Sequence, residues 1–320
     1  MAQDFFIGVD LGATSVKTGV VDSAGIIVDQ AAADAKGSEG PETVVRQIAF
    51  TINELMKRQS SVCCRGIGVG SPGIVSLDRN TVSYPPNFSD WTDIHLGDML
   101  ARKFPFPVRV ENDANVAAIA EAKFGAGIDE RDFIFVIWGT GVGGGIIVDK
   151  QIFHGPHGGA GEIGHLSIDH NGPQCNCGNR GCIESYIGQR YLSQRTKEIL
   201  NRKTKGSAPS LIERLVGGNL DDIEPRIISA AAEQGDRIAQ DILREAGELL
   251  GFALSSAMNL LDIRVGVIGG GISAAPDFVF HAIESAARSR VLQPHRSHIR
   301  ILRAKLGNSA GIIGAASLVM

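Results

Sequence analysis

The chain has 320 residues, of which 43% are hydrophobic and 21% charged, so it is long enough to bury the core of one large or two medium domains. Its net charge of -4 provides no basic field for nucleic acid or anionic lipid. The opening MAQDFFIGVD lacks the pattern of a secretion signal, and the apolar runs are too short to span a bilayer. We therefore expect a cytoplasmic protein without nucleic-acid or membrane partners.

Short apolar runs ending in glycine alternate with helical patterns along the chain. The runs at 5–12, 65–73, 133–145 and 264–271 are expected to be strands that feed tight glycine loops. The expected helices, in which apolar residues recur at three- and four-residue steps, cover 42–57 and 236–261. Over 108–127 a strand is expected to run into a helix. This alternation predicts an α/β protein.

One pattern occurs twice. IGVDLGATSVKTGVVD (7–22) and IFVIWGTGVGGGIIVD (134–149) both contain a strand, a glycine-bearing polar turn and a returning apolar strand. Gly12 aligns with Gly139, and Asp22 with Asp149. The repeat predicts two related lobes, each offering one glycine hairpin to a shared cleft.

Two familiar phosphate motifs nearly match and are rejected. GATSVKT (12–18) lacks the glycine that precedes the lysine of a Walker A loop, and an apolar strand follows it instead of a helix. GTGVGG (139–144) fits the dinucleotide fingerprint, but IIVD follows it, again a strand. Neither of the two corresponding folds is predicted.

Glycine hairpins can nevertheless bind phosphate, because their backbone N–H groups approach an anion closely. Thr14, Ser15 and Thr140 add hydroxyl donors, Lys17 adds a charge, and Asp10 is placed to hold Mg²⁺ through water. A single loop of this kind is more often only a tight turn. The pair of hairpins, together with GVIGGG at 266–271, favours phosphate binding.

VRVENDANVAAIAEAKFGAG (108–127) places Asp113 at or near a helix N-terminus, at the end of a strand where ligand clefts form. Phosphoryl transfer to a hydroxyl needs a positioned carboxylate, Mg²⁺ and donors to the phosphates. Asn112 or Asp113 can equally be an ordinary N-cap, since Asn and Asp are preferred there.

Five cysteines are too few for a disulfide scaffold, and their number is odd. Cys63 and Cys64 lie in an expected buried strand, where cysteine acts as a small hydrophobe. The other three follow His165 in the spacing H-x9-C-x-C-x4-C, and His165, Cys175, Cys177 and Cys182 make a complete tetrahedral set for structural Zn²⁺. A redox pair and incidental loop cysteines are the alternatives. His157 and His170 are off the pattern and are expected to be solvated.

DLGATSVKTGVVD, WGTGVGGGIIVD and VIGGGIS resemble the loops of the sugar kinases of the ROK family. The resemblance extends from Ile7 to LGNSAGIIGAASL (306–318) and includes the GEIGH…C-x-C-x4-C-x-E pattern. It implies the two-lobed actin-like ATPase (ribonuclease H-like) fold, structural Zn²⁺, and Mg²⁺ with ATP.

The resemblance also implies roles for individual residues. Asp113 would be the catalytic base, and Asn112, Glu162, His165 and Glu184 would contact sugar hydroxyls. The residues implied in nucleotide binding lie in the three glycine loops and are Asp10, Gly12, Ala13, Thr14, Ser15, Lys17, Gly139, Thr140, Gly141, Gly270 and Gly271.

The sugar is expected to be glucose. YPPNFSDW (84–91) resembles a segment of the glucose kinases in which the asparagine, here Asn87, reaches sugar hydroxyls. In SPGIV (71–75), Gly73 leaves room for the ring, and Ile74 stands where N-acetylmannosamine kinases can carry an arginine. An N-acetylhexosamine kinase is the nearest alternative, followed by kinases of fructose, mannose or allose.

Two other classes of protein compete with the kinase. Some ROK members are sugar-responsive repressors with an N-terminal helix-turn-helix domain, for which a first core strand at about Phe5 leaves no room. An Hsp70-like chaperone would lack the zinc loop. For the enzyme, the expected lobes are 1–112, with the helix at 307–320 packing back on it, and 113–306, which carries the zinc loop. The resemblance further implies a homodimer or homotetramer.

Overall fold

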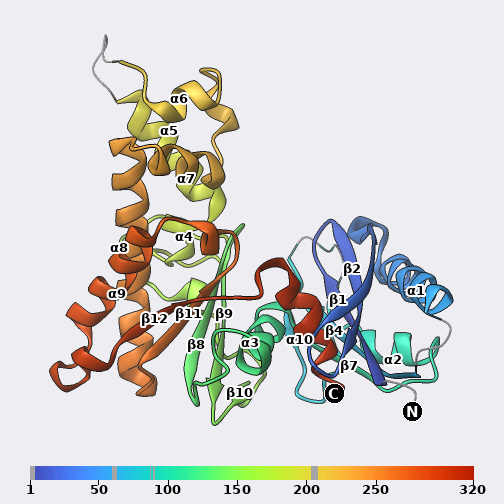
Figure 1. The fold of residues 1–320 in the computed structure, drawn as a ribbon. Helices are drawn as coiled ribbons and strands as arrows, with labels where there is room; N and C mark the ends of the chain where they lie inside the picture. Colours follow the sequence, from blue (N-terminus) through green and yellow to red (C-terminus); the bar gives the residue numbers. More distant parts are fainter. Residues whose placement is uncertain (1–3, 60–62, 87, 89–90, 203–207) are drawn as a thin grey trace. The chain divides into compact units, whose positions relative to one another are not determined.

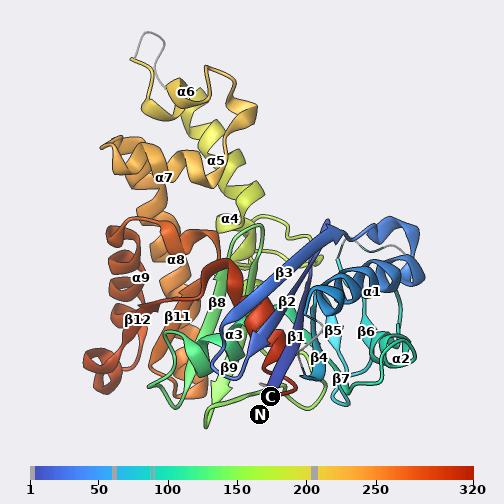
Figure 2. The same cartoon turned by 45° about the vertical axis from the view of Figure 1, so that its right-hand side comes forward.

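The computed structural model describes residues 4–59, 63–86, 88, 91–202 and 208–320 (Figures 1 and 2). Contacts divide the chain into two compact units. The first unit contains Met1–Arg131, Gly145–Gly161 and Lys305–Met320, and the second contains Asp132–Gly144 and Glu162–Ala304. None of the helices in these described ranges is long and apolar enough to cross a membrane.

A five-stranded sheet forms the centre of the first unit. Strand β1 pairs antiparallel with β2 and β2 with β3, whereas β1, β4 and β7 run parallel. In spatial order the strands are β3 (Ile27–Asp34), β2 (Ser15–Asp22), β1 (Asp4–Leu11), β4 (Cys63–Ser71) and β7 (Val108–Asn112). Val9, Val16, Ile67, Val69 and Val110 are fully buried in its core.

Four α-helices and a small hairpin complete the part of the first unit that the structure describes. They are α1 (Pro41–Arg58), the hairpin β5 (Ile74–Val75) and β6 (Val82–Ser83), α2 (Leu96–Ala101), α3 (Asp113–Phe124) and α10 (Ala310–Ala316), with the 3-10 turns η1 (Gly37–Glu39) and η6 (Gly307–Ser309). The helix expected over 42–57 is therefore confirmed as α1. So is the strand that runs into a helix over 108–127.

The second sheet repeats the order of the first. Its strands are β10 (Gln151–Ile152), β9 (Val142–Val148), β8 (Phe133–Trp138), β11 (Val265–Gly269) and β12 (Arg300–Arg303). As in the first sheet, antiparallel strands (β10 and β9) form one side, and parallel strands (β8, β11 and β12) form the other. The predicted repeat of strand, glycine turn and strand is thus confirmed, because β1–β2 and β8–β9 hold equivalent places.

Helices α8 and α9 lie side by side in the second unit, and α5, α6 and α7 extend away from the strands β8, β11 and β12 (Figures 1 and 2). The elements are η2 (Ile163–His165), α4 (Glu184–Ile187), α5 (Gln189–Asn201), α6 (Leu211–Leu215), η3 (Leu220–Asp222), α7 (Pro225–Glu233), α8 (Arg237–Leu261), η4 (Gly271–Ala274), α9 (Asp277–Arg290) and η5 (Gln293–His298). The helix expected at 236–261 is confirmed as α8.

Both rejected phosphate motifs run into strands, as predicted. GATSVKT leads into β2, and GTGVGG leads into β9. Among the described residues, the element that directly follows each motif is a strand and not a helix, so neither turn has the geometry of a P-loop or a dinucleotide fingerprint.

The first unit, as its contacts define it, includes α3 and the segment Gly145–Gly161. Both lie beyond the lobe boundary expected at residue 112. The division into 1–112 and 113–306 stays a prediction. One sequence expectation needs correction: Cys63 and Cys64 begin β4 and are only half-buried, because the core of that strand starts further along, at Gly66.

Helix α10 contacts β1, β4 and α3 at distances that only glycine allows. A Cβ on Gly8 would overlap the carbonyl oxygen of Ile312, one on Gly68 that of Ala315, and one on Gly314 that of Val116. The backbones therefore meet without intervening side chains. This close approach anchors the C-terminal helix to the sheet.

We expect Gly68→Ala to lower the free energy of unfolding by about 1–3 kcal/mol or more, because the added methyl forces α10 away from β4. Denaturant unfolding measures the change. Gly159→Ala is the matched control, since nothing lies within 4 Å of its added Cβ. Equal free energies of unfolding for the two variants would show that α10 can move away from β4 without loss of stability.

Candidate active site

The carboxyl ends of β1, β4 and β7 bring predicted residues of the first unit to one edge of its sheet. In the parallel register Asp10 lies opposite Gly70, and Ser71 lies opposite Asn112. The loop that contains Gly73 starts at this edge, and Asp113 begins α3 there. Ligand sites commonly form outside the carboxyl ends of parallel strands.

The side chain of Asn112 is the N-cap of α3. Its Oδ1 accepts hydrogen bonds from the backbone N–H groups of Ala114 at 2.9 Å and Asn115 at 3.1 Å. Its Nδ2 donates to the carbonyl of Gly73 at 3.0 Å. An amide nitrogen carries two protons, so one N–H of Asn112 is left over from these bonds. The capping interpretation of the sequence is thus confirmed for Asn112.

Asp113 is the first residue of α3 and its side chain is exposed. Its Oδ1 accepts a hydrogen bond from the N–H of Ala114 at 2.8 Å. The helix N-terminus stabilises a negative charge at this place. The carboxylate is thereby oriented and accessible, as a proton acceptor must be.

Gly73 adopts a left-handed backbone with φ of 94°. A Cβ there would lie 2.7 Å from the carbonyl oxygen of Ser83 and 2.8 Å from Cα of Pro85. Only glycine therefore fits between the two arms of this loop. Of the neighbouring segment 84–91, Tyr84 N–H donates to the carbonyl of Trp91 at 3.0 Å, whereas Asn87 lies outside the described residues.

The first glycine turn is closed by one backbone bond, from Gly12 N–H to the carbonyl of Ser15 at 2.9 Å. Ala13, Thr14 and Lys17 are exposed around it. Asp10 is half-buried, and its burial raises the pKa of its carboxyl, while the charge of Lys17 lowers it. A Cβ on Gly311 would lie 2.7 Å from the carboxyl carbon of Asp10, so α10 packs directly against this carboxylate.

The second and third glycine loops meet in the second unit. Gly139 N–H donates to the carbonyl of Gly141 at 3.0 Å, which closes the turn around the exposed Thr140. Gly270 has φ of 84°, and a Cβ on it would lie 2.5 Å from the carbonyl oxygen of Trp138. The backbone of Gly271 lies beside the second loop, because its nitrogen is 3.9 Å from a Cβ built on Gly139, an ordinary contact distance. The predicted nucleotide residues of this unit therefore form one cluster.

Glu184 ties this cluster to the cysteine loop. Its Oε2 accepts a hydrogen bond from Val142 N–H at 2.9 Å, and a Cβ on Gly141 would lie 2.5 Å from the same oxygen. At the other end of α4, the indole N–H of Trp138 donates to the carbonyl of Ile187 at 2.8 Å. Glu162 is exposed directly before η2, which contains His165.

The four predicted zinc ligands come together. The ligand atoms of His165, Cys175, Cys177 and Cys182 all lie within 4.8 Å of one another. Sγ of Cys177 and Sγ of Cys182 are 3.7 Å apart, and Sγ of Cys175 is 3.8 Å from Nδ1 of His165. Two thiolates on one tetrahedral zinc, at Zn–S of about 2.3 Å, lie about 3.8 Å apart. The donor set and its spacing therefore fit Zn²⁺.

The surroundings of the three thiols differ. Burial raises the pKa of the Cys175 thiol and raises that of Cys182 to about 12. The backbone N–H of Asn179 lowers the pKa of the more exposed Cys177. All three are free cysteines. His157 and His170, which are off the zinc pattern, are exposed as expected.

Sequence reasoning gave no role to Glu111, a carboxylate only 2% exposed that precedes Asn112. Burial opposes its ionisation, but hydrogen bonds from His154, Asn115 and the N–H of Asn112, together with the charge of Arg79, outweigh it and lower its pKa. Ionised Glu111 therefore stabilises the fold at neutral pH, and this contribution is lost as the pH falls through its folded-state pKa. The signal in the sequence that could have identified Glu111 is its position directly before Asn112, at the end of the predicted strand.

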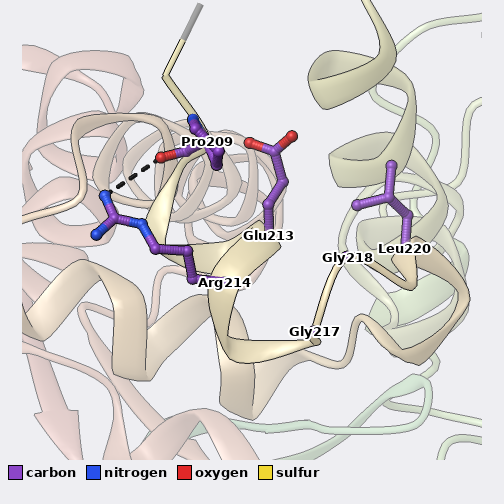
Figure 3. A pocket seen from close by; sticks show the side chains of 6 residues that line it. All are labelled: Pro209, Glu213, Arg214, Gly217, Gly218 and Leu220. Carbon is purple, nitrogen blue, oxygen red and sulfur yellow. Dashed lines mark hydrogen bonds between the residues drawn. The ribbon is translucent and has the colours of Figure 1, made fainter.

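A hollow of about 390 Å³ lies in the helical extension of the second unit (Figure 3). Its wall includes the hydrogen bond from Arg214 to the carbonyl of Pro209 at 3.3 Å. The lining residues are Pro209, Glu213, Arg214, Gly217, Gly218 and Leu220. None of the predicted site residues that the structure describes lines it.

The model of the ROK family matches residues 6–320. The chain belongs to the ROK family. Its predicted fold class, the α/β actin-like ATPase fold, is confirmed by the match to solved ROK structures. A ROK family glucokinase from Streptomyces griseus, solved in complex with glucose and AMPPNP, superposes with a TM-score of 0.85 at 35% identity, covering 98% of this chain and 99% of that one.

Curated ROK relatives include both enzymes and regulators. The glucokinase of Streptomyces coelicolor is 35% identical over 313 residues, which cover 98% of this chain and 96% of that protein. The xylose repressor of Caldicellulosiruptor bescii is 28% identical over 317 residues, which cover 98% of this chain and 77% of the repressor. Family membership alone therefore does not distinguish a sugar kinase from a sugar-responsive repressor.

We expect protein purified without chelator to contain about one zinc per chain, since one such ligand set is present. Cys177→Ala should lose most of it, because three ligands bind zinc far more weakly than four. Metal analysis by mass spectrometry measures the ratio. Cys63→Ala is the control and should retain the metal; zinc-free wild-type protein would contradict the assignment.

Proposed function

We propose that the protein is an ATP-dependent hexose kinase that phosphorylates the 6-hydroxyl of glucose. The observation that carries the proposal is the exposed carboxylate of Asp113 at the N-terminus of α3, beside the Gly73 loop. The likeness to a glucokinase solved with glucose and AMPPNP, over nearly the whole of both chains, supports the same activity.

In the proposed reaction Asp113 accepts the proton of the sugar 6-hydroxyl. The oxygen then forms a bond to the γ-phosphorus of ATP as the bond to the β–γ bridging oxygen breaks, and ADP leaves. The second N–H of the Asn112 side chain, beyond the one that bonds the carbonyl of Gly73, donates to a neighbouring sugar hydroxyl. Gly73, Asn87, Glu162, His165 and Glu184 are the other proposed sugar contacts.

The nucleotide is proposed to bind at the glycine loops. In the first, Gly12, Ala13, Thr14, Ser15 and Lys17 offer backbone N–H groups, hydroxyls and a charge to phosphate. Asp10 fits a water-mediated Mg²⁺ ligand, because its half-buried carboxylate lies one residue before the end of β1, beside this turn. Gly139, Thr140 and Gly141 are proposed for phosphate, and Gly270 and Gly271 for adenosine.

Zinc, when bound, would supply folding energy to the loop and no reacting group. His165 would hold the metal through Nδ1, since that nitrogen faces Cys175, and its Nε2 would serve a sugar hydroxyl. Glu184 follows Cys182 by two residues and keeps one oxygen on Val142 N–H. The loop would thereby orient two sugar contacts.

Two alternatives remain in view. A kinase of N-acetylhexosamines, or of other hexoses such as fructose or allose, would use the same catalytic groups. Ile74 argues only against the N-acetylmannosamine kinases that carry an arginine at this position of the sugar loop. A sugar-responsive regulator is suggested by the repressor relatives. The exposed carboxylate of Asp113 favours catalysis, because sensing a sugar requires no base.

We expect ADP release to depend on hexose, with glucose giving the highest kcat/KM in a panel with mannose, fructose, allose, N-acetylglucosamine and N-acetylmannosamine. A coupled ADP assay and detection of the sugar 6-phosphate measure it. A higher kcat/KM for an N-acetylhexosamine would transfer the proposal to that substrate. Hexose binding without ADP release would favour the regulator.

We expect Asp113→Asn to reduce kcat by at least about 10²–10⁴-fold, the range of general-base effects, because the amide cannot accept the proton. Glucose affinity should change little, as measured by calorimetry. Asp98→Asn is the matched control, since Asp98 also lies in the first turn of a helix of the same unit. Near-normal kcat in Asp113→Asn would remove this residue from the role.

A further inference from the structure

Glu111 lies directly before the proposed sugar contact Asn112 and the proposed base Asp113, yet its own carboxylate is buried under four hydrogen-bond donors. Its Oε1 accepts from Asn112 N–H at 2.9 Å and from Nδ2 of Asn115 at 3.0 Å. Its Oε2 lies 2.7 Å from Nε2 of His154 and 2.8 Å from Nη1 of Arg79. The carboxylate is therefore fully engaged within the protein and has no lone pair directed at a ligand.

Arg79 connects this carboxylate to the hairpin that follows Gly73. It lies in the turn between β5 and β6 with φ of 61°, a backbone conformation that a side chain disfavours. Its carbonyl accepts a hydrogen bond from Val110 N–H at 2.9 Å. The base of the hairpin is attached to β7 by a separate bond, in which the carbonyl of Gly73 accepts from Nδ2 of Asn112 at 3.0 Å. The hairpin is thus fixed to the end of β7 at both its base and its tip.

His154 connects a third segment to the same carboxylate. Its carbonyl accepts a hydrogen bond from Ala160 N–H at 3.1 Å, which closes a compact loop that ends just before Glu162 in the chain. A Cβ on Gly158 would lie 2.5 Å from the carbonyl oxygen of Val75, so this loop packs against the hairpin. The fixed position of the hairpin therefore also supports the loop.

The donor roles in the cluster follow from distance. At 2.7 Å, Nε2 of His154 and Oε2 of Glu111 must share a proton, and that proton belongs to the imidazole. Nε2 then has no lone pair for Nη2 of Arg79, which is 3.2 Å away. Arg79 is consequently held by Glu111 and not by His154. Its side chain is 22% exposed and that of Glu111 is 2% exposed, so the ion pair is little screened by water.

We propose that Glu111 is a positioning residue that sets the sugar side of the site by clamping the β5–β6 hairpin through Arg79 and the following loop through His154. The inference rests on the proposed kinase function. Glu111 acts on the sugar only through groups that it places, namely Gly73 at the base of the hairpin and Asn112 next along the chain. The nucleotide loops Gly12–Ser15 and Gly139–Gly141 make none of these contacts, so hexose and ATP parameters should separate.

The test compares Arg79→Met, Glu111→Gln and the double variant, with Arg79→Lys as the conservative variant. We expect Arg79→Met to raise the KM for glucose about 10- to 100-fold, the order of affinity lost when a charged hydrogen bond that holds the sugar side of the site is removed, while the KM for ATP changes less than about twofold. Arg79→Lys retains the charge and should recover most of the glucose affinity. Arg65→Met, which breaks the exposed pair of Arg65 with Asp4, is the control and should leave both constants unchanged.

The double variant tests whether Arg79 and Glu111 act through one interaction. If they do, its glucose KM should be no higher than that of the worse single variant, because the second change removes nothing further. Arg79→Met is the milder change and keeps the test open if Glu111→Gln does not fold. In the variants, amide hydrogen exchange at Val110 should also be faster than in the wild-type protein, because the N–H of Val110 donates to the carbonyl of Arg79.

The outcomes separate the two proposals. Wild-type protein that releases no ADP with any hexose overturns the kinase function. Active wild-type protein whose Arg79→Met variant keeps its glucose KM, or loses glucose and ATP affinity equally, overturns the positioning role of Glu111. Multiplicative effects of the two single changes overturn the clamp and leave the kinase function standing.

Discussion

The junction between β7 and α3 depends on the side chain of Asn112. By capping the helix with Oδ1, it fixes where α3 begins and therefore where Asp113 projects. By donating from Nδ2 to Gly73, it fixes the loop that leaves the neighbouring strand. One amide thus sets both the proposed base and the proposed sugar loop. Any side chain without both a donor and an acceptor at this place would release one of them.

Close approach at glycine residues is the second constraint on the structure. Glycines let α10 touch β1 and β4, and they let Gly270 lie against Trp138. Gly141 leaves room for the carboxylate of Glu184 in the same way. Gly8, Gly68 and Gly141 are needed mainly for the space that a Cβ would take, whereas Gly73 and Gly270 also need their left-handed backbone. The glycine-rich composition is therefore a packing requirement as much as a source of turns.

In the second unit a single short helix, α4, joins the cysteine loop to the second glycine turn. Glu184 at its start bonds the N–H of Val142, and Ile187 at its end receives the indole N–H of Trp138. Gln189 just beyond donates to the carbonyls of Gly139 and Thr140. These bonds join the segment that follows the cysteine loop to the turn proposed to bind phosphate, over one helical turn.

Local patterns in the sequence determined the α/β class, the strand-to-helix junction at Asn112, the repeated hairpins and the cluster of four candidate zinc ligands. Each of these is encoded in one short stretch, where periodicity, capping preference or ligand spacing can be read directly. Tertiary structure alone decided that Arg79 and His154 meet at Glu111, since Glu111 and His154 are 43 residues apart in sequence and Arg79 and His154 are 75 apart. It also decided that Glu121 accepts the N–H of Leu306 across 185 residues. Such pairs form because a buried carboxylate must find donors wherever the folded chain brings them, and no spacing rule records which segments those will be.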